Sequence, residues 1–153
     1  MQEHDVERFI EPVTQHLAAA LREISAGEKE THWMWFMFPQ LRMLGHSDTA
    51  KYYGLTDVDD ACQFLRHPVL GPTFEQLVEA TYKVIVEQGG NISRVFGFPD
   101  DLKLMSSLTL FERAAIAEQR TLLAERCAAI IAAGVEQGLS PCSTTLAAMD
   151  GRS

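Results

Sequence analysis

The sequence predicts a mainly α-helical protein, a single compact domain of six or seven helices around an aromatic-rich core. In several segments, apolar residues recur at the three- and four-residue spacing of one helical face. Glycine, proline and capping residues stand at the ends of these segments. Strand-like alternation is scarce, and no internal repeat is present. A length of 153 residues, with 46% hydrophobic and 22% charged residues, suits one globular domain.

The first predicted helix begins near Asp5 and ends near Gly27. Its apolar residues all fall on one helical face: Val6, Phe9, Ile10, Val13, Leu17, Ala20, Leu21 and Ile24. The next segment, THWMWFMFPQ at residues 31–40, contains both tryptophans of the chain. It is apolar on every side, so its periodicity does not distinguish a buried strand from a short buried helix over residues 32–38.

The middle of the chain predicts two helices, each with a cap. Ser47 can cap a short helix over residues 48–53. Residues 56–59, TDVD, have the form of a capping box that opens a second helix toward Arg66. His67-Pro68 ends that helix.

The second half predicts four helices. Gly71-Pro72 begins one that ends at Gly89-Gly90, and residues 91–96 form one or two helical turns. Acidic residues in the first turn predict a helix from Pro99 to about residue 117, because they complement the helix dipole. The last predicted helix spans residues 118–133. We therefore expect a helical domain over residues 1–137 and a frayed tail over residues 138–153.

Composition argues against several classes of function. The net charge of −8 disfavours nucleic acid as a partner. The three cysteines are far apart and form no zinc motif, so we expect no metal site and no disulfide framework. Phosphate-binding glycine motifs and hydrolase signatures are absent, so no cofactor is expected. The acidic N-terminal residues do not resemble a signal peptide, and no apolar run is long enough for a membrane helix. We expect a cytoplasmic protein.

The aromatic segment is the first candidate site. Trp33 and Trp35 can stack on a flat ligand, and His32 can act as an acid or base near neutral pH. Gln40 is an amide beside a buried segment, and Lys29 precedes the segment. The alternative is that the aromatic residues form the core.

The second candidate site is on the helix that starts at Pro99. Asp100, Lys103 and Ser107 fall within about one-sixth of the helical circumference, beside an apolar stripe. The lysine and aspartate can bind a charged substrate, and Ser107 lies within helical neighbour range of the lysine. The alternative is a surface ion pair with a nearby serine.

Ser47 and His67 form a third, weaker group of candidate ligand-binding residues. Each stands close to a predicted helix start, where free backbone N–H groups favour anions. The alternative for each is a helix cap or a solvated side chain.

Four ordered stretches resemble a known family. They are GEKETHWMWFMFPQ at residues 27–40, LGHS at 44–47, HPVLG at 67–71 and FGFPDDLKLMSSLTLF at 96–111. Together they resemble a domain-of-unknown-function (DUF) family of small, mostly bacterial proteins that are often labelled "calpastatin". The resemblance implies a mainly α-helical fold and no particular activity. The calpastatin label does not suit this chain, since a calpain inhibitor is a flexible polar repeat chain.

We therefore expect a small-molecule-binding protein with an enclosed pocket between the aromatic segment and the helix at residues 99–111. Its ligand would be nucleotide- or sugar-like, and the sequence leaves open whether the ligand is hydrolysed. In this interpretation His32, Asp100, Lys103 and Ser107 are the catalytic candidates. The alternative is a non-enzymatic protein-interaction module, one form of which is a homodimer.

Overall fold

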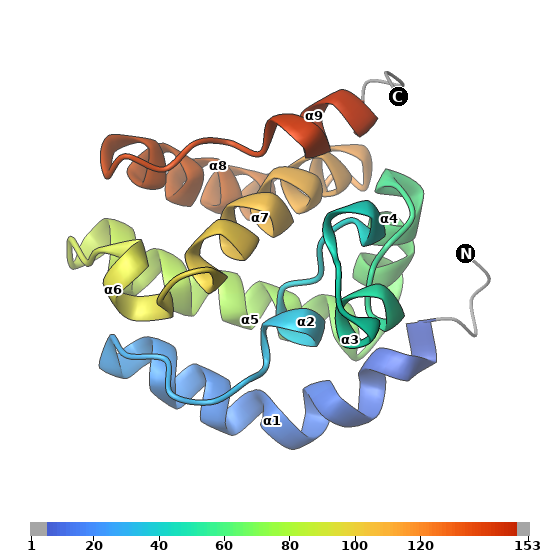
Figure 1. Ribbon diagram of the computed structural model, residues 1–153, viewed down its shortest axis with the longest axis horizontal. Helices are drawn as coiled ribbons and strands as arrows, with labels where there is room; N and C mark the ends of the chain where they lie inside the picture. Colours follow the sequence, from blue (N-terminus) through green and yellow to red (C-terminus); the bar gives the residue numbers. More distant parts are fainter. Residues whose placement is uncertain (1–5, 150–153) are drawn as a thin grey trace.

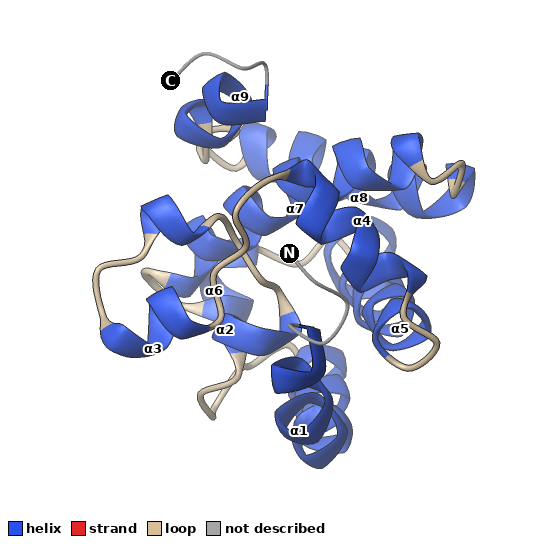
Figure 2. Ribbon diagram, turned by 90° about the vertical axis from the view of Figure 1, so that its right-hand side faces the viewer, coloured by secondary structure: helices blue, strands red, loops and turns tan. Residues whose placement is uncertain are grey.

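A computed structural model shows a chain built from helices (Figure 1). It describes residues 6–149, without the side chain of Ser143. The elements, in chain order, are α1 (Glu7–Ala26), α2 (Met34–Met37), the 3-10 turn η2 (Arg42–Leu44), α3 (Asp48–Tyr52), α4 (Val58–Arg66), α5 (Leu70–Tyr82), the π-helical turn η3 (Lys83–Glu87), α6 (Ile92–Phe96), α7 (Asp100–Ala117), α8 (Thr121–Glu136) and α9 (Ser143–Met149). Over the described residues there is no strand, only an isolated parallel bridge between Leu41 and Leu55 (Figure 2). The predicted mainly α fold is confirmed.

The seven predicted helices correspond to α1 and to α3 through α8. The segment that the sequence left open, residues 32–38, contains the short helix α2. The segment 138–153, for which we expect fraying, contains α9, which packs against α7. The predicted helix start at Asp5 and the chain ends at residues 1–5 and 150–153 lie outside the described residues.

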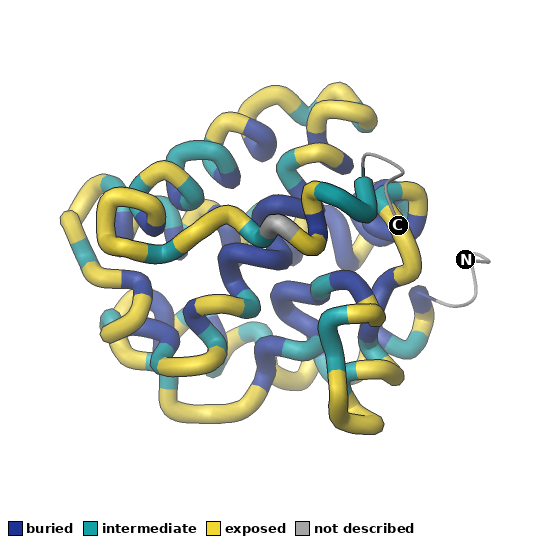
Figure 3. The backbone as a smooth tube through the Cα atoms, turned by 45° about the horizontal axis from the view of Figure 1, so that its top comes forward, coloured by how far each residue is buried: buried dark blue, intermediate teal, exposed yellow. Residues whose placement is uncertain are grey.

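The helices form layers with α7 in the middle. α5 lies between α1 and α8, and α7 packs most extensively against α8 and next against α4 (Figure 1). Every residue of α7 from Leu104 to Phe111 is buried, so this stretch of the helix is enclosed on all sides. Exposed residues lie on the outer turns of the surrounding helices (Figure 3).

An aromatic cluster occupies the interior beneath α2. The ring of Trp33 lies 6.2 Å from those of Phe38 and Phe96, and Phe38 lies 5.8 Å from Phe74. Phe74 in turn lies 4.2 Å from Phe111 of α7. These rings pack edge-to-face or tilted, as aromatic pairs prefer. The aromatic-rich core is therefore confirmed, and it joins α2 to the central helix.

Local signals fix several of the helix ends. Gly27 ends α1 with a left-handed φ of 78°, which a glycine adopts without strain. Ser47 caps α3 as predicted. The cap of α4 is Asp57 rather than the predicted Thr56, because the Asp57 carboxylate accepts the Asp60 N–H. α8 begins at Thr121, three residues later than predicted, after a turn in which Gln119 has a φ of 59°.

The described helices fall short of what a membrane span requires. None of them combines the necessary length with a sufficiently apolar stretch.

Candidate functional site

A buried glutamate organises the loop that leads into the aromatic segment. Glu23, on the last turns of α1, is only 4% exposed. One carboxylate oxygen accepts the backbone N–H groups of Glu30 and Thr31 at 2.8 and 3.0 Å and the indole N–H of Trp33 at 3.0 Å. The other accepts the Thr31 hydroxyl at 2.7 Å. The carboxylate therefore fixes the backbone on both sides of the loop.

These hydrogen bonds determine the ionisation of Glu23. Burial alone would raise its pKa, but the hydrogen bonds from Thr31, Glu30 and Trp33 outweigh burial and lower the pKa from 4.5 to about 2. Sequence reasoning missed this residue. The available signal was an acid in the last turns of a helix, where the dipole disfavours negative charge, next to the buried Ile24.

The loop that Glu23 holds places Lys29 beside the start of α7. The ammonium of Lys29 lies 2.9 Å from a carboxylate oxygen of Asp100, and its side chain is only 5% exposed. It also donates to the carbonyl of Thr31 and lies 4.9 Å from the centre of the Trp33 ring. A buried ammonium requires such partners, because desolvation of an unpaired charge is costly.

Lys103 approaches the same carboxylate from α7 itself. Its ammonium lies 3.4 Å from the second oxygen of Asp100 and 5.2 Å from the centre of the Trp35 ring. The side chain of Lys103 is 26% exposed, so its charge reaches the surface. One carboxylate thus serves two ammonium groups, which leaves one positive charge in excess. We call Lys29, Asp100 and Lys103 the lysine–aspartate network.

The two tryptophans occupy different positions beside this network. Trp33 is fully buried in the aromatic core. Trp35 is half-buried, and the ring of the exposed His32 lies 6.4 Å from it. Trp33 is therefore part of the core, whereas Trp35, His32 and Lys103 form a rim at the surface.

A small cavity lies behind this rim. Its volume is about 10 Å³, and its lining residues come from α2, α3, α7 and the loops after α2 and α3: Met34, Trp35, Phe38, Gln40, Ala50, Tyr53, Gly54 and Lys103. Such a volume accommodates about one water molecule. Among the described residues, this place therefore has no enclosed pocket of ligand size. A larger ligand would have to lie at the rim.

Ser107 lies one helical turn further along α7. It is fully buried, and its Oγ has no hydrogen-bond partner. The hydroxyls of Ser106 and Thr109 instead donate to carbonyls four residues earlier in the helix. An activated nucleophile needs a base within hydrogen-bond reach, and Ser107 has none in this arrangement.

Two of the predicted ligand-binding residues lie elsewhere and act as caps. The Ser47 hydroxyl accepts the Ala50 N–H at 3.0 Å at the start of α3. His67 Nδ1 accepts the N–H groups of Val69 and Leu70 at 3.1 and 3.3 Å, ahead of α5. These contacts are those of helix caps, the alternative to ligand binding for both residues.

The other predicted residues, apart from Ser107, lie together. They are Lys29, His32, Trp33, Trp35, Gln40, Asp100 and Lys103.

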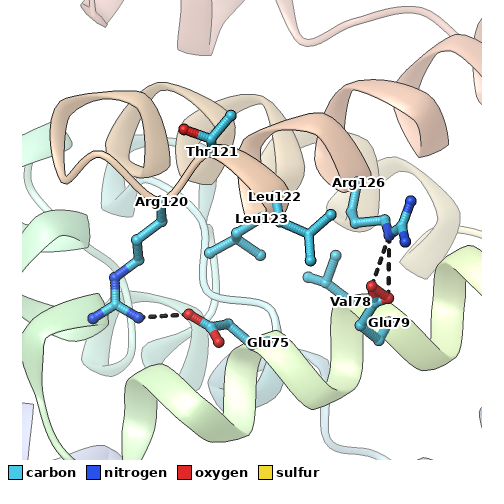
Figure 4. A pocket seen from close by; sticks show the side chains of 8 residues that line it. All are labelled: Glu75, Val78, Glu79, Arg120, Thr121, Leu122, Leu123 and Arg126. Carbon is cyan, nitrogen blue, oxygen red and sulfur yellow. Dashed lines mark hydrogen bonds and ion pairs between the residues drawn. The ribbon is translucent and has the colours of Figure 1, made fainter.

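A separate hollow of about 310 Å³ lies between α5 and α8 (Figure 4). Its apolar part is formed by Val78, Leu122 and Leu123. Ion pairs stand on either side, one between Arg120 and Glu75 and the other between Arg126 and Glu79. No group of three or more His, Cys, Asp or Glu residues in the described part of the chain could hold a metal ion.

The fold and the site define a small all-helical domain with a lysine–aspartate network beside a tryptophan rim. The sequence profile of the family described as "Protein of unknown function (DUF1810)" matches residues 3–132, and the chain belongs to this family. Among solved structures, it is similar to the conserved hypothetical protein Rv1873 from Mycobacterium tuberculosis. The two share 36% sequence identity with a TM-score of 0.85, over 97% of this chain and 99% of the other. The comparison with curated proteins gives no match.

Proposed function

We propose that this protein binds a small, negatively charged ligand that carries a flat ring, of the nucleotide- or sugar-like class, at the rim formed by His32, Trp35 and Lys103. The observation that carries the proposal is the charge balance of the lysine–aspartate network. Asp100 serves both lysines, and the more exposed ammonium is that of Lys103. On a chain of net charge −8, such an excess cation provides a place for an anion.

Each rim residue offers a specific contact. Trp35 presents a large, half-buried aromatic surface for a ring or sugar face. Lys103 meets the negative charge of the ligand, while Lys29 holds Asp100 in place. His32 is the exposed group that could move a proton if the bound ligand is hydrolysed.

Two further polar residues lie near Lys103, and one of them lines the cavity behind the rim. The Ser107 hydroxyl is without a partner, and the Gln40 side chain lines the cavity behind Trp35. An unpaired buried hydroxyl costs about 1–3 kcal/mol of folding stability. Ser107 does not line this cavity, so of the two residues it is Gln40 that supports the rim as the binding place.

A thermal-shift screen tests this proposal. The purified protein is heated with NAD, ADP-ribose, adenine nucleotides and sugar phosphates, each in large excess. A ligand at about 100 times its Kd stabilises the folded state by about 2.7 kcal/mol. We expect one chemical class to raise the melting temperature, and Lys103→Ala to abolish the shift.

The matched control is Lys83→Ala, which removes an exposed lysine from η3. The control should keep the full shift. The proposal fails if no ligand shifts the melting temperature, or if both lysine variants reduce the shift equally.

A second candidate function is self-association through the α5–α8 hollow. Leu122 in this hollow is 57% exposed, the α8 wall carries Arg120 and Arg126, and the α5 wall carries Glu75 and Glu79. In a two-fold symmetric pair, the arginines of one copy can face the glutamates of the other. We expect the protein to be a dimer at micromolar concentration in sedimentation experiments and Leu122→Lys to be a monomer. A monomeric wild-type protein would contradict this candidate.

A further inference from the structure

A second hollow, whose lining contains no tryptophan, lies where the start of α1 meets α3. Its volume is about 530 Å³, which falls in the range of small-molecule sites. Three of its lining residues are basic: Arg8 from α1, Arg42 from η2 and Lys51 from α3. The chain has only 13 lysines and arginines against 21 acids, so three basic residues around one hollow form a local positive region.

The backbone of Gly54 lies next to all three basic residues. Its carbonyl accepts a guanidinium N–H of Arg8 at 3.1 Å, and its N–H donates to the carbonyl of Lys51 at 3.2 Å. Arg42 lies so close that a Cβ atom added to Gly54 would stand 2.4 Å from its Cα. Only glycine permits this approach. Gly54 thus binds the guanidinium of Arg8 and brings the backbones of Arg42 and Lys51 together.

Further bonds make the arrangement rigid. Arg8 also donates to the carbonyl of Tyr52 at 2.8 Å, and the N–H of Arg42 donates to the carbonyl of Leu55 at 2.7 Å. The Arg42 and Lys51 side chains are exposed and make no hydrogen bond or ion pair within the described residues. Their donors are therefore available to a ligand, on a backbone that is already ordered.

Two carboxylates also line the hollow, and both lie at helix starts. Asp60 is buried and accepts the N–H of Thr56 at 2.7 Å at the beginning of α4. Asp48 is in the first turn of α3, where the helix dipole favours negative charge. The three cations outnumber them, and two of the cations, Arg42 and Lys51, are on exposed residues.

We infer that this hollow, which we call the Gly54 hollow, binds the phosphate group of a small phosphorylated molecule. Phosphate is the anion that matches the donors, because a guanidinium can bind two of its oxygens while an ammonium acts as a point charge. No residue of the lysine–aspartate network and none of His32, Trp35 and Lys103 lines this hollow; Gly54 is the residue that it shares with the small cavity behind the rim.

The test is a titration of the isotope-labelled full-length protein with inorganic pyrophosphate, followed by NMR chemical shifts of the backbone amides. We expect saturable shifts at the amides of Arg42 and Lys51, which line this hollow and not the cavity behind the rim. The double variant Arg42→Gln/Lys51→Gln should bind at least tenfold more weakly. Both substitutions are at exposed positions, so the fold is retained.

The control double variant is Arg22→Gln/Lys83→Gln, which changes the net charge equally at exposed positions outside the hollow. It should bind within twofold of the wild-type protein. The inference is overturned if no saturable shift occurs, or if the two double variants weaken binding equally. It is also overturned if the shifts occur at Lys29, Trp35 and Lys103 instead, a result that would leave the proposed rim site intact.

Discussion

Two sets of ion pairs in this protein differ in how deeply they are buried. The lysine–aspartate network lies between the aromatic segment and α7, with Lys29 at 5% exposure. The pairs of Arg120 with Glu75 and Arg126 with Glu79 lie across the α5–α8 hollow, with every side chain between 30% and 47% exposed. Exposed pairs contribute little to stability, and buried ones often contribute less than apolar residues of similar size.

The two sets of ion pairs also differ in what holds their side chains in position. The α5–α8 pairs connect two helices, and their arginines have one further partner each: the carbonyl of Leu65 for Arg120 and the ring of Tyr82 for Arg126. The lysine–aspartate network depends on a loop that is itself held by the buried Glu23. A protein selected only for stability has no need of this arrangement, whereas a binding site requires charges held in fixed positions. The predictions below measure this contrast.

The largest effect is expected for Glu23→Ala. The variant leaves the buried indole N–H of Trp33 without its acceptor and removes three more hydrogen bonds from the loop. We expect a loss of about 3–4 kcal/mol in the free energy of unfolding, measured with urea. Glu11→Ala, at an exposed position on the same helix, should change it by less than about 0.5 kcal/mol. Equal effects of the two substitutions would mean that Glu23 does not organise the loop.

The stabilisation by Glu23 should depend on pH. Its pKa is about 2 in the folded protein and about 4.5 when unfolded, so the unfolded chain binds the proton first as the pH falls. The contribution is complete above about pH 5 and disappears as the pH falls toward 2. Its size is on the order of 3 kcal/mol.

This dependence is measured by comparing the unfolding of the wild-type protein and Glu23→Gln across that range of pH. The difference between them should shrink as the solution becomes more acidic. A difference that stays constant from pH 7 to pH 2.5 would show that the ionised carboxylate is not the stabilising form.

A smaller effect is expected for Lys29→Met, which replaces the buried ammonium by an apolar side chain of similar length. Asp100 keeps Lys103 as a partner and is itself 20% exposed. The loss of stability should therefore stay within about 1–2 kcal/mol. A loss above about 4 kcal/mol would place the network among the main stabilising interactions and weaken the case for a site.

The smallest effect is expected for the ion pairs across the α5–α8 hollow. Arg126→Ala breaks the pair with Glu79 and also removes a guanidinium that lies 4.0 Å from the centre of the Tyr82 ring. Both contacts are partly exposed, so we expect a change of about 0.5–1 kcal/mol in chemical unfolding. A larger loss than that of Lys29→Met would reverse the contrast between the two sets.

Much of the fold could be predicted from local patterns. Helix faces, the cap at Ser47 and the end of α1 at Gly27 depend on residues that are close in sequence, so their signals survive without tertiary information. The aromatic segment could not be resolved, because a segment that is apolar on all sides has no helical periodicity. α9 was missed for a different reason: its packing against α7 cannot be seen from a Ser/Thr-rich tail.

The candidate site could likewise be predicted only in part from the sequence. The stripe of Asp100 and Lys103 on one helix, and the aromatic segment, were both found as separate groups. That Lys29 pairs with Asp100 across 71 positions of the sequence was not predictable, because this contact depends on how α1 and α7 are placed. Glu23 and Gly54 were missed because their roles depend on hydrogen bonds and on the close approach of distant backbone.

The tryptophan rim is tested most directly by intrinsic fluorescence. The two tryptophans report on different places, since Trp33 is buried and Trp35 lies at the rim. Titration with ADP-ribose or an adenine nucleotide should change the emission of the wild-type protein. Trp35→Phe should abolish the change, and Lys103→Ala should shift it to at least tenfold higher ligand concentration. A change that persists in Trp35→Phe, or no change with any of these ligands, would contradict a ligand site at this rim.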